Sequence, residues 1–273
     1  MRKCIDVLKQ SPIITGVIGV VVAVGGTKIL GPATSDLITK IDHRVLLFLS
    51  MCVFIYLISR EKAFEKCHTT TGYAVRWGLL ILIPQTPNLL LRIFSGQSIA
   101  SDWPIKFVLG LILCLFVGLF EESAFRVIIN DAILYKFRNS RHVFVWIAII
   151  SSLVFGAVHV FPANISTASA VMNVSLKTIQ TGLTGFCFLI LYWKTRNLWG
   201  IALAHALYDA VSIVPAAIYD DTSGIGSADS YVNAGGEAVF VYLVYICILA
   251  IVAIILWRKI GKKIDFEEIR KTW

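Results

Sequence analysis

Two adjacent carboxylates and an arginine lie in the middle of a long apolar stretch of this chain. Glu121, Glu122 and Arg126 interrupt an apolar run over about 105–137, which is too long and too apolar for a surface helix. An unpaired charge at the centre of a membrane helix costs about 2.5 kcal/mol or more, so charge at that depth indicates a functional site. On a helix, Glu122, Arg126 and Asn130 recur every four residues and form one polar stripe.

The same charges also allow a purely structural interpretation. A Glu122–Arg126 ion pair could do no more than lock helix packing. Glu121, however, lies about 100° around the helix from Glu122 and gains no partner in that interpretation. We therefore expect the two carboxylates to face different partners.

Two further apolar stretches each carry a histidine at helical spacing from another residue. His159 follows Phe155 by four residues, and His205 precedes Asp209 by four, so each pair shares one helix face. A single buried histidine is more often a structural residue than a catalyst. Ionisable groups on three separate spans, however, avoid lipid best by converging. Two Glu, two His and one Asp in a partly dry cavity can activate water.

Composition excludes a soluble domain and sets the class. The chain is 57% hydrophobic and 15% charged over 273 residues, and its mean hydropathy is +0.78. We predict an all-α, polytopic helical membrane protein that forms a single membrane domain over 1–273. The net charge of +8 is distributed over the ends of apolar spans, whereas a nucleic-acid partner would require a contiguous basic patch.

About eight apolar spans are predicted, each near the roughly 20 residues that cross a bilayer. They lie at about 12–31, 44–60, 73–94, 105–137, 142–160, 175–193, 198–218 and 238–258. Pro84 and Pro87 predict a kink or break in the third.

Basic residues alternate between the two sides of these spans. The richer side predicts cytoplasmic termini, and in a bacterium the membrane would be the plasma membrane. The 219–237 loop, without Lys or Arg, is predicted to be external. The richer side contains Arg2, Lys3, Lys9, Arg60, Lys62, Lys66, Arg76, Lys136, Arg138, Arg141, Lys194, Arg196 and the tail from Arg258.

The depths estimated for the predicted site residues, counted in residues from the inner membrane surface, do not agree fully with one another. Measured from the basic residues at the inner surface, Glu121 lies roughly 22 Å deep and His159 roughly 27 Å deep, at about 1.5 Å per residue. His205 lies only roughly 14 Å beyond Arg196, which is shallow by about 10 Å. Either the connection at 197–200 is sunk into the membrane, or the long fourth span protrudes inward.

Taken together, the three motifs resemble those of the CPBP family of intramembrane proteases. This family includes the type II CAAX prenyl endopeptidases and the bacterial Abi proteins linked to bacteriocin self-immunity. Its motifs EExxxR, FxxxH and HxxxN/D are matched in order by 121–126, 155–159 and 205–209. The resemblance covers a protease-like core at about 105–215. It implies an endopeptidase that hydrolyses a peptide bond of a membrane-associated peptide or protein.

The resemblance also implies a role for each residue. Glu121 is the general base that deprotonates a water, and His159 holds that water. Glu122 and Arg126 form an orienting ion pair, while His205 and Asp209 face the developing oxyanion. A carboxylate base of this kind requires no cofactor.

Position 209 departs from the prenyl endopeptidases, which have Asn there. An ionised Asp209 can only accept hydrogen bonds and would repel an oxyanion. It could instead orient and charge His205, or be protonated by burial. As a further alternative, His159, His205 and Asp209 could bind a divalent metal such as zinc, since family members are often described as metalloproteases. The soluble zinc-protease motif HExxH is absent.

Two other functional classes remain open. The protein could be a non-catalytic membrane scaffold, or an immunity-type protein of the same fold that binds a peptide without cutting it. It could also be a transporter, because intramembrane Glu, Arg and His form ion relays, although no inverted repeat supports this. The complete Glu, Glu, His, His set favours the protease.

Overall fold

The fold is all helical in a computed structural model that describes residues 7–8, 10–30, 36–59, 63, 69–94, 96–161, 165–219 and 236–271. Within these ranges the chain forms no strand, and its one β-bridge joins Ile99 to Tyr219. The helices are α2 (Pro12–Leu30), α3 (Leu37–Ser59), α5 (Thr71–Gly78), η1 (Leu79–Gln85), α6 (Thr86–Ile93), α7 (Trp103–Glu122), η2 (Ser123–Ile128), α8 (Ile129–Phe137), α9 (Val143–Val158), α10 (Ala168–Thr195), α11 (Leu198–Ile218), α13 (Gly236–Lys259), η3 (Gly261–Lys263) and α14 (Phe266–Lys271).

The prediction of an all-α polytopic membrane protein is confirmed, but the count of eight spans is not. Among the described residues, six helices are long and apolar enough to cross a membrane. Helix α9 is also apolar but has only 16 residues. The predicted third span is broken as expected, because a 3₁₀ segment that contains Pro84 separates α5 from α6.

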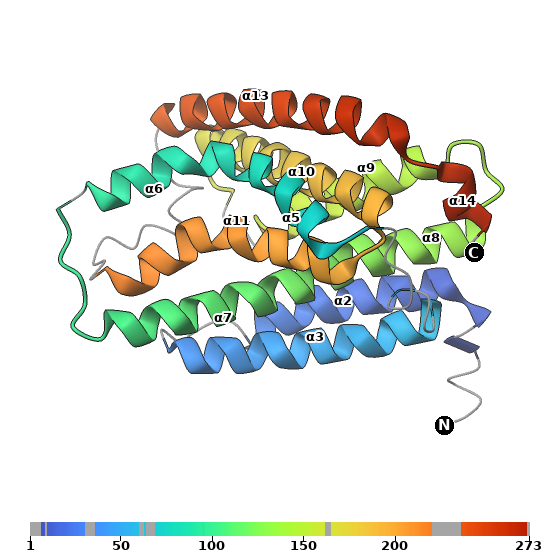
Figure 1. The fold of residues 1–273 in the computed structure, drawn as a ribbon, viewed down its shortest axis with the longest axis horizontal. Helices are drawn as coiled ribbons and strands as arrows, with labels where there is room; N and C mark the ends of the chain where they lie inside the picture. Colours follow the sequence, from blue (N-terminus) through green and yellow to red (C-terminus); the bar gives the residue numbers. More distant parts are fainter. Residues whose placement is uncertain are drawn as a thin grey trace.

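The helices form an elongated bundle, shown in Figure 1 with its long axis horizontal. Helix α13 runs along the top edge, α3 and α7 run along the bottom, and α10 and α11 lie between them. The first turn of α2 and the whole of α14 lie at the same end of the bundle, at the right of Figure 1. Several features used to predict orientation lie outside the described residues: Arg2, Lys3, Lys9, Arg60, Lys62, Lys66 and residues 220–235 of the predicted external loop.

The outward faces of the bundle are apolar. Large side chains such as Val21, Val53 and Phe240 are 63%, 58% and 71% exposed. In water such a surface would be an aggregation liability, whereas in a bilayer it contacts acyl chains of similar polarity. The chain is an integral membrane protein.

Small residues allow the helices that carry the predicted motifs to pack closely. A Cβ at Gly118 on α7 would collide with the backbone carbonyl of Ala202 on α11. A Cβ at Gly156 on α9 would likewise collide with the carbonyl of Thr178 on α10. Close backbone approach at small residues is a principal mode of helix packing in membranes. Each contact lies three residues before a predicted site residue, since Glu121 follows Gly118, His159 follows Gly156 and His205 follows Ala202.

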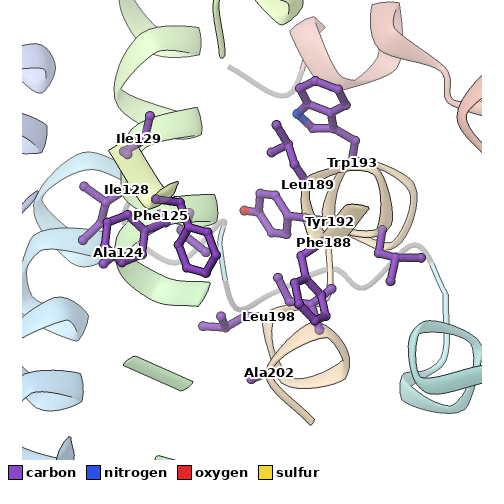
Figure 2. Packing of buried hydrophobic residues seen from close by; sticks show 14 of the residues in the cluster. Ala124, Phe125, Ile128, Ile129, Phe188, Leu189, Tyr192, Trp193, Leu198 and Ala202 are labelled. Carbon is purple, nitrogen blue, oxygen red and sulfur yellow. The ribbon is translucent and has the colours of Figure 1, made fainter. Parts of the chain in front are cut away.

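The long fourth span is not a uniform α-helix. Residues 123–128 form a π-helical segment, and all six are buried. Figure 2 shows Phe125 on this helix facing the side of α10 that carries Phe188 and Tyr192. A π turn takes up one residue more than an α turn and therefore shifts the register of the helix beyond it.

The predicted stripe through Asn130 is changed by this shift. Asn130 donates to Asp131 over 2.7 Å and accepts from the indole of Trp193 over 2.8 Å. The stripe therefore holds for Glu122 and Arg126, while Asn130 belongs to a separate polar cluster.

The turn between α10 and α11 lies inside the bundle. Arg196 adopts a left-handed conformation with φ of 45°, and Asn197 caps α11 by accepting from the Gly200 amide over 2.9 Å. Asn197 is only 3% exposed, and its amide lies 3.3 Å from the Thr69 carbonyl. The connection is therefore buried within the protein and His205 lies beside Glu122, while the depth of the connection in the membrane stays a prediction.

Candidate active site

Glu122 has two partners, a hydrogen bond with His205 and an ion pair with Arg126. Its Oε1 lies 2.6 Å from Nδ1 of His205, and its Oε2 lies 3.1 Å from Nε of Arg126. Glu122 and Arg126 are both 0% exposed. One carboxylate therefore joins α7 to α11 and also neutralises the buried guanidinium one turn further along.

Phe155 gives the second motif a structural explanation. The Arg126 guanidinium carbon lies 4.0 Å from the centroid of the Phe155 ring, a cation–π distance. The same ring packs edge-on against His159, with 4.5 Å between the ring centroids. Phe155 thus holds the arginine of the first motif and the histidine of its own motif.

His205 is fixed on two sides. The Phe188 ring stacks on it at a centroid distance of 4.7 Å and an interplanar angle of 15°, and Glu122 accepts from Nδ1. The other nitrogen, Nε2, lies 3.8 Å from Glu121 Oε2 and 3.7 Å from Asp209 Oδ2. Three carboxylates therefore surround the imidazole.

His159 has its own tautomer set by the backbone. Its Nδ1 lies 2.7 Å from the carbonyl oxygen of Phe155. A carbonyl only accepts, so Nδ1 carries the proton, and in the neutral ring Nε2 carries the lone pair. That Nε2 lies 3.6 Å from Glu121 Oε2.

Glu121 occupies the point where these groups meet. Its side chain is 13% exposed, and its Oε2 accepts no hydrogen bond from any described residue. The separations of 3.6 Å to His159 and 3.8 Å to His205 are too long for direct hydrogen bonds, and a water beside these three atoms can contact all of them. The structure thus brings Glu121, Glu122, Arg126, His159, His205 and Asp209 together in one cluster.

A cavity of about 330 Å³ opens beside this cluster. His159, His205 and Asp209 form part of its wall, and α10 contributes a polar face. The remaining lining residues are Gln85, Phe155, Lys177, Gln180, Thr181, Thr184, Tyr208, Ser212, Ala238, Val241, Tyr242 and Tyr245. Its size and mixed lining suit a short stretch of peptide.

Sequence reasoning missed two residues of the site. Phe188 carries no signal in the sequence, because an aromatic residue in an apolar span is ordinary. Arg44 fits the pattern of a basic residue that sets membrane orientation at the start of an apolar span. Nothing in the sequence places it near the site. Its guanidinium lies 5.5 Å from the centroid of the Phe120 ring, and it acts electrostatically on both Glu121 and Asp209.

The metal hypothesis does not fit the described residues. No group of three or more His, Cys, Asp or Glu side chains among them is arranged to hold a metal ion. Nδ1 of His205 is committed to Glu122 and Nδ1 of His159 to a carbonyl, so neither of these two nitrogens is available to a metal ion.

Comparison with known families agrees with the three motifs. Residues 103–211 match the family model described as type II CAAX prenyl endopeptidase Rce1-like, close to the predicted core at about 105–215. No curated protein and no solved structure shows significant similarity to the chain. The matched region runs from α7 to α11 and contains all six residues of the cluster. This match over residues 103–211 supports a protease of the CPBP family, similar to the Rce1-like type II CAAX prenyl endopeptidases.

Proposed function

We propose that this protein is an intramembrane endopeptidase in which Glu121 activates a water for attack on a peptide bond. The observation that carries the proposal is the different commitment of the two adjacent carboxylates. Glu122 is fully buried and bound by His205 and Arg126, whereas Glu121 is partly exposed and lies 3.6 and 3.8 Å from two imidazole nitrogens without a direct hydrogen bond to either. A general base needs that freedom, and a structural carboxylate does not.

The reaction follows from the positions of these groups. A water in contact with both Glu121 and Nε2 of His159 loses a proton to the Glu121 carboxylate as its oxygen bonds to the peptide carbonyl carbon. When the C–N bond breaks, the same proton passes from Glu121 to the leaving amine. No covalent bond to the protein is needed, and no further reactant is consumed.

His205 is the group best placed to stabilise the tetrahedral intermediate. Its Nδ1 proton is held by Glu122, so the protonated ring directs an Nε2–H toward the centre of the cluster. A preorganised donor in a water-poor site is worth several kcal/mol at a developing oxyanion. Stacking by Phe188 keeps the ring in that orientation.

Asp209 influences the hydrogen-bond donor that His205 provides. It does not itself donate to the oxyanion, as the Asn of the prenyl endopeptidases does. Its carboxylate lies 3.7 Å from Nε2 of His205, close enough to support the positive ring and too far for a direct hydrogen bond. An ionised carboxylate at this position also opposes negative charge on the substrate oxygen. The Asp209 carboxylate therefore both supports the positive charge of His205 and opposes the negative charge of the oxyanion.

The basic end of the bundle supports a cytoplasmic location for both termini. Helices α8, α10 and α13 all finish near α14, at the right of Figure 1. Lys136, Lys194 and Lys259 lie in their last turns. An excess of Lys and Arg marks the cytoplasmic side of a membrane protein.

The direct test compares membrane peptides from cells that express the wild type with those from cells that express Glu121→Gln. The protease predicts peptides that accumulate uncut in the variant, and the purified wild type should cleave a prenylated CAAX peptide while the variant does not. A scaffold or immunity-type protein would bind such a peptide and leave it intact in both preparations. Equal cleavage by both proteins would exclude Glu121 as the base.

A further inference from the structure

A second cavity lies between α2, α8 and α9, away from the candidate active site. Its volume is about 560 Å³, and it shares no lining residue with the cavity of the site. Helix α9 stands between the two, because Val154 lines this groove and Phe155 lines the site cavity. Among the described residues that line the groove, only Ser140 and the indole of Trp146 carry a polar side-chain group. The groove is therefore built for an apolar ligand.

Small residues create the hollow between these helices. A Cβ at Gly16 on α2 would lie only 2.7 Å from Cβ of Ala132 on α8, so the two backbones approach closely there. Larger side chains stand around this contact and face outward, such as Val21 at 63% and Ile150 at 39% exposure. The volume falls within the roughly 300–1,000 Å³ of small-molecule sites. Since the groove opens on the apolar surface of a membrane protein, a hydrocarbon chain is the ligand that reaches it.

The length of the groove matches one leaflet of a bilayer. On α9 its lining residues run from Val143 to Val154, which is about 16 Å at about 1.5 Å per residue. The hydrocarbon core of a bilayer is about 30 Å thick, so one leaflet supplies about half of that depth. The groove begins beside the turn that joins α8 to α9, at the end of the bundle where α14 lies (Figure 1). It can therefore take an acyl chain whose headgroup lies at that end.

Two basic side chains stand at the mouth of the groove. Lys136 follows Ala132 by four residues and Ile133 by three, so it lies on the face of α8 that lines the groove. Arg141 directly follows Ser140, the polar residue of the lining. Both basic side chains are exposed, and neither forms an ion pair within the described part of the chain.

The neighbouring helix α14 does not neutralise this charge. The Glu267 carboxylate lies 3.5 Å from Nε of Arg270, and Arg270 in turn donates to the backbone carbonyl of Arg141 over 3.4 Å. Trp146, which is 55% exposed, lines the groove one turn inside α9, as an aromatic residue does at the headgroup level. Basic pockets between membrane helices bind anionic lipid headgroups.

We propose that the groove between α2, α8 and α9 binds one anionic phospholipid. One acyl chain lies in the groove, and Lys136 and Arg141 hold the phosphate of the headgroup. The inference is independent of the proposed proteolysis. Because α9 carries Phe155 and His159, a lipid bound there supports the wall of the site from outside, and it stabilises the folded protein by mass action.

The experiment compares phosphatidylglycerol, which is anionic, with phosphatidylcholine that has the same acyl chains. Each lipid is titrated into the purified wild-type protein in a neutral detergent, and bound lipids per chain are counted by native mass spectrometry. A basic residue near an anionic headgroup contributes about a factor of five in affinity. For two such residues we expect one phosphatidylglycerol to bind about ten- to thirtyfold more tightly than phosphatidylcholine. The SDS concentration at which the protein unfolds should rise with phosphatidylglycerol.

Matched variants separate the groove from the basic end of the bundle as a whole. Lys136→Gln/Arg141→Gln should remove the preference for phosphatidylglycerol. The pair Lys259→Gln/Lys262→Gln removes the same charge from exposed positions of α13 and η3 and should retain it.

A second pair of variants tests the acyl-chain site. Val154→Phe fills the groove and should weaken both lipids about tenfold. Val145→Phe, on an exposed part of α9 outside the groove, should weaken neither.

Three results would overturn the lipid site. The first is equal affinity of the wild type for the two lipids, and the second is a preference that both charge-removal pairs lower equally, which would mean general attraction to a basic surface. The third is another occupant: bound lipid displaced by S-farnesylcysteine methyl ester would assign the groove to the prenyl group. A lipid-free dimer that Val154→Phe separates would likewise assign the groove to a second copy of the chain.

Discussion

Replacing Glu122 by Gln should destabilise the protein far more than the same change at Glu121. Glu122 and Arg126 are both 0% exposed, with 3.1 Å between Oε2 and Nε, so the substitution leaves a buried guanidinium without its counter-charge. Removing one partner of a buried pair costs about 3–5 kcal/mol. The charged acceptor 2.6 Å from His205 is also lost and replaced by a neutral one, which costs about 1 kcal/mol more.

Glu121 provides the matched control for this comparison. Glu121→Gln removes a partly exposed carboxylate whose Oε2 accepts no hydrogen bond from the described residues, so we expect a change below about 1 kcal/mol. The free energy of unfolding of both variants can be measured by SDS titration in mixed micelles, alongside cleavage of the prenylated peptide. The double variant Glu122→Gln/Arg126→Met should recover much of the lost stability, because both charges are then absent. A Glu122→Gln protein as stable as Glu121→Gln, or a Glu121→Gln protein that retains wild-type activity while a well-folded Glu122→Gln protein is inactive, would show that the two roles are reversed.

The same geometry makes three other predictions. Glu121→Gln and His159→Ala should each lower kcat about a hundredfold or more while the protein elutes normally in size-exclusion chromatography, as expected for a base and its water ligand. Asp209→Asn should preserve or raise activity, because an amide donates to an oxyanion and Glu122 still holds His205; a variant that loses both activity and bound zinc, together with reversible inhibition by chelators, would favour the metal hypothesis instead. Gly118→Ala should lower stability by about 1–3 kcal/mol, measured by the same SDS titration, because the added methyl group meets the rigid backbone of Ala202 rather than a side chain.

Much of the site could be predicted because buried charge in a membrane is costly. That single constraint selects Glu121, Glu122, His159 and His205 from an otherwise apolar chain, and all four lie in one cluster. Helical spacing then gives the Glu122–Arg126 pair correctly. Spacing within one helix cannot give a distance between helices, so the short contact from His205 to Glu122 could not be predicted.

The count of eight spans is not confirmed, and the reason is local. Apolar length indicates how much chain can cross a membrane but not whether it remains a continuous helix. Residues 71–93 have the length of a span, yet a 3₁₀ segment interrupts them, and α9 is shorter than its apolar stretch. The polar face of α10 is visible in the sequence at its spacing of three and four residues, but a lone Lys177 near a span end is equally typical of an orientation charge.

The π-helical segment at 123–128 gives the fourth span two independent halves. Before it, Glu121 and Glu122 face α11 and α9; after it, Asn130 and Asp131 bind Trp193, Ser59 and Arg196. The π turn holds one residue more than an α turn over about the same rotation, so the segment absorbs that residue without turning one half away from its partners. Deleting one residue from the segment would restore a regular α-helix with both halves still facing their partners, whereas a deletion elsewhere in the span would rotate one half by about 100° relative to the other. Residues 123–128 are therefore the part of this span in which the loss of one residue should be tolerated best.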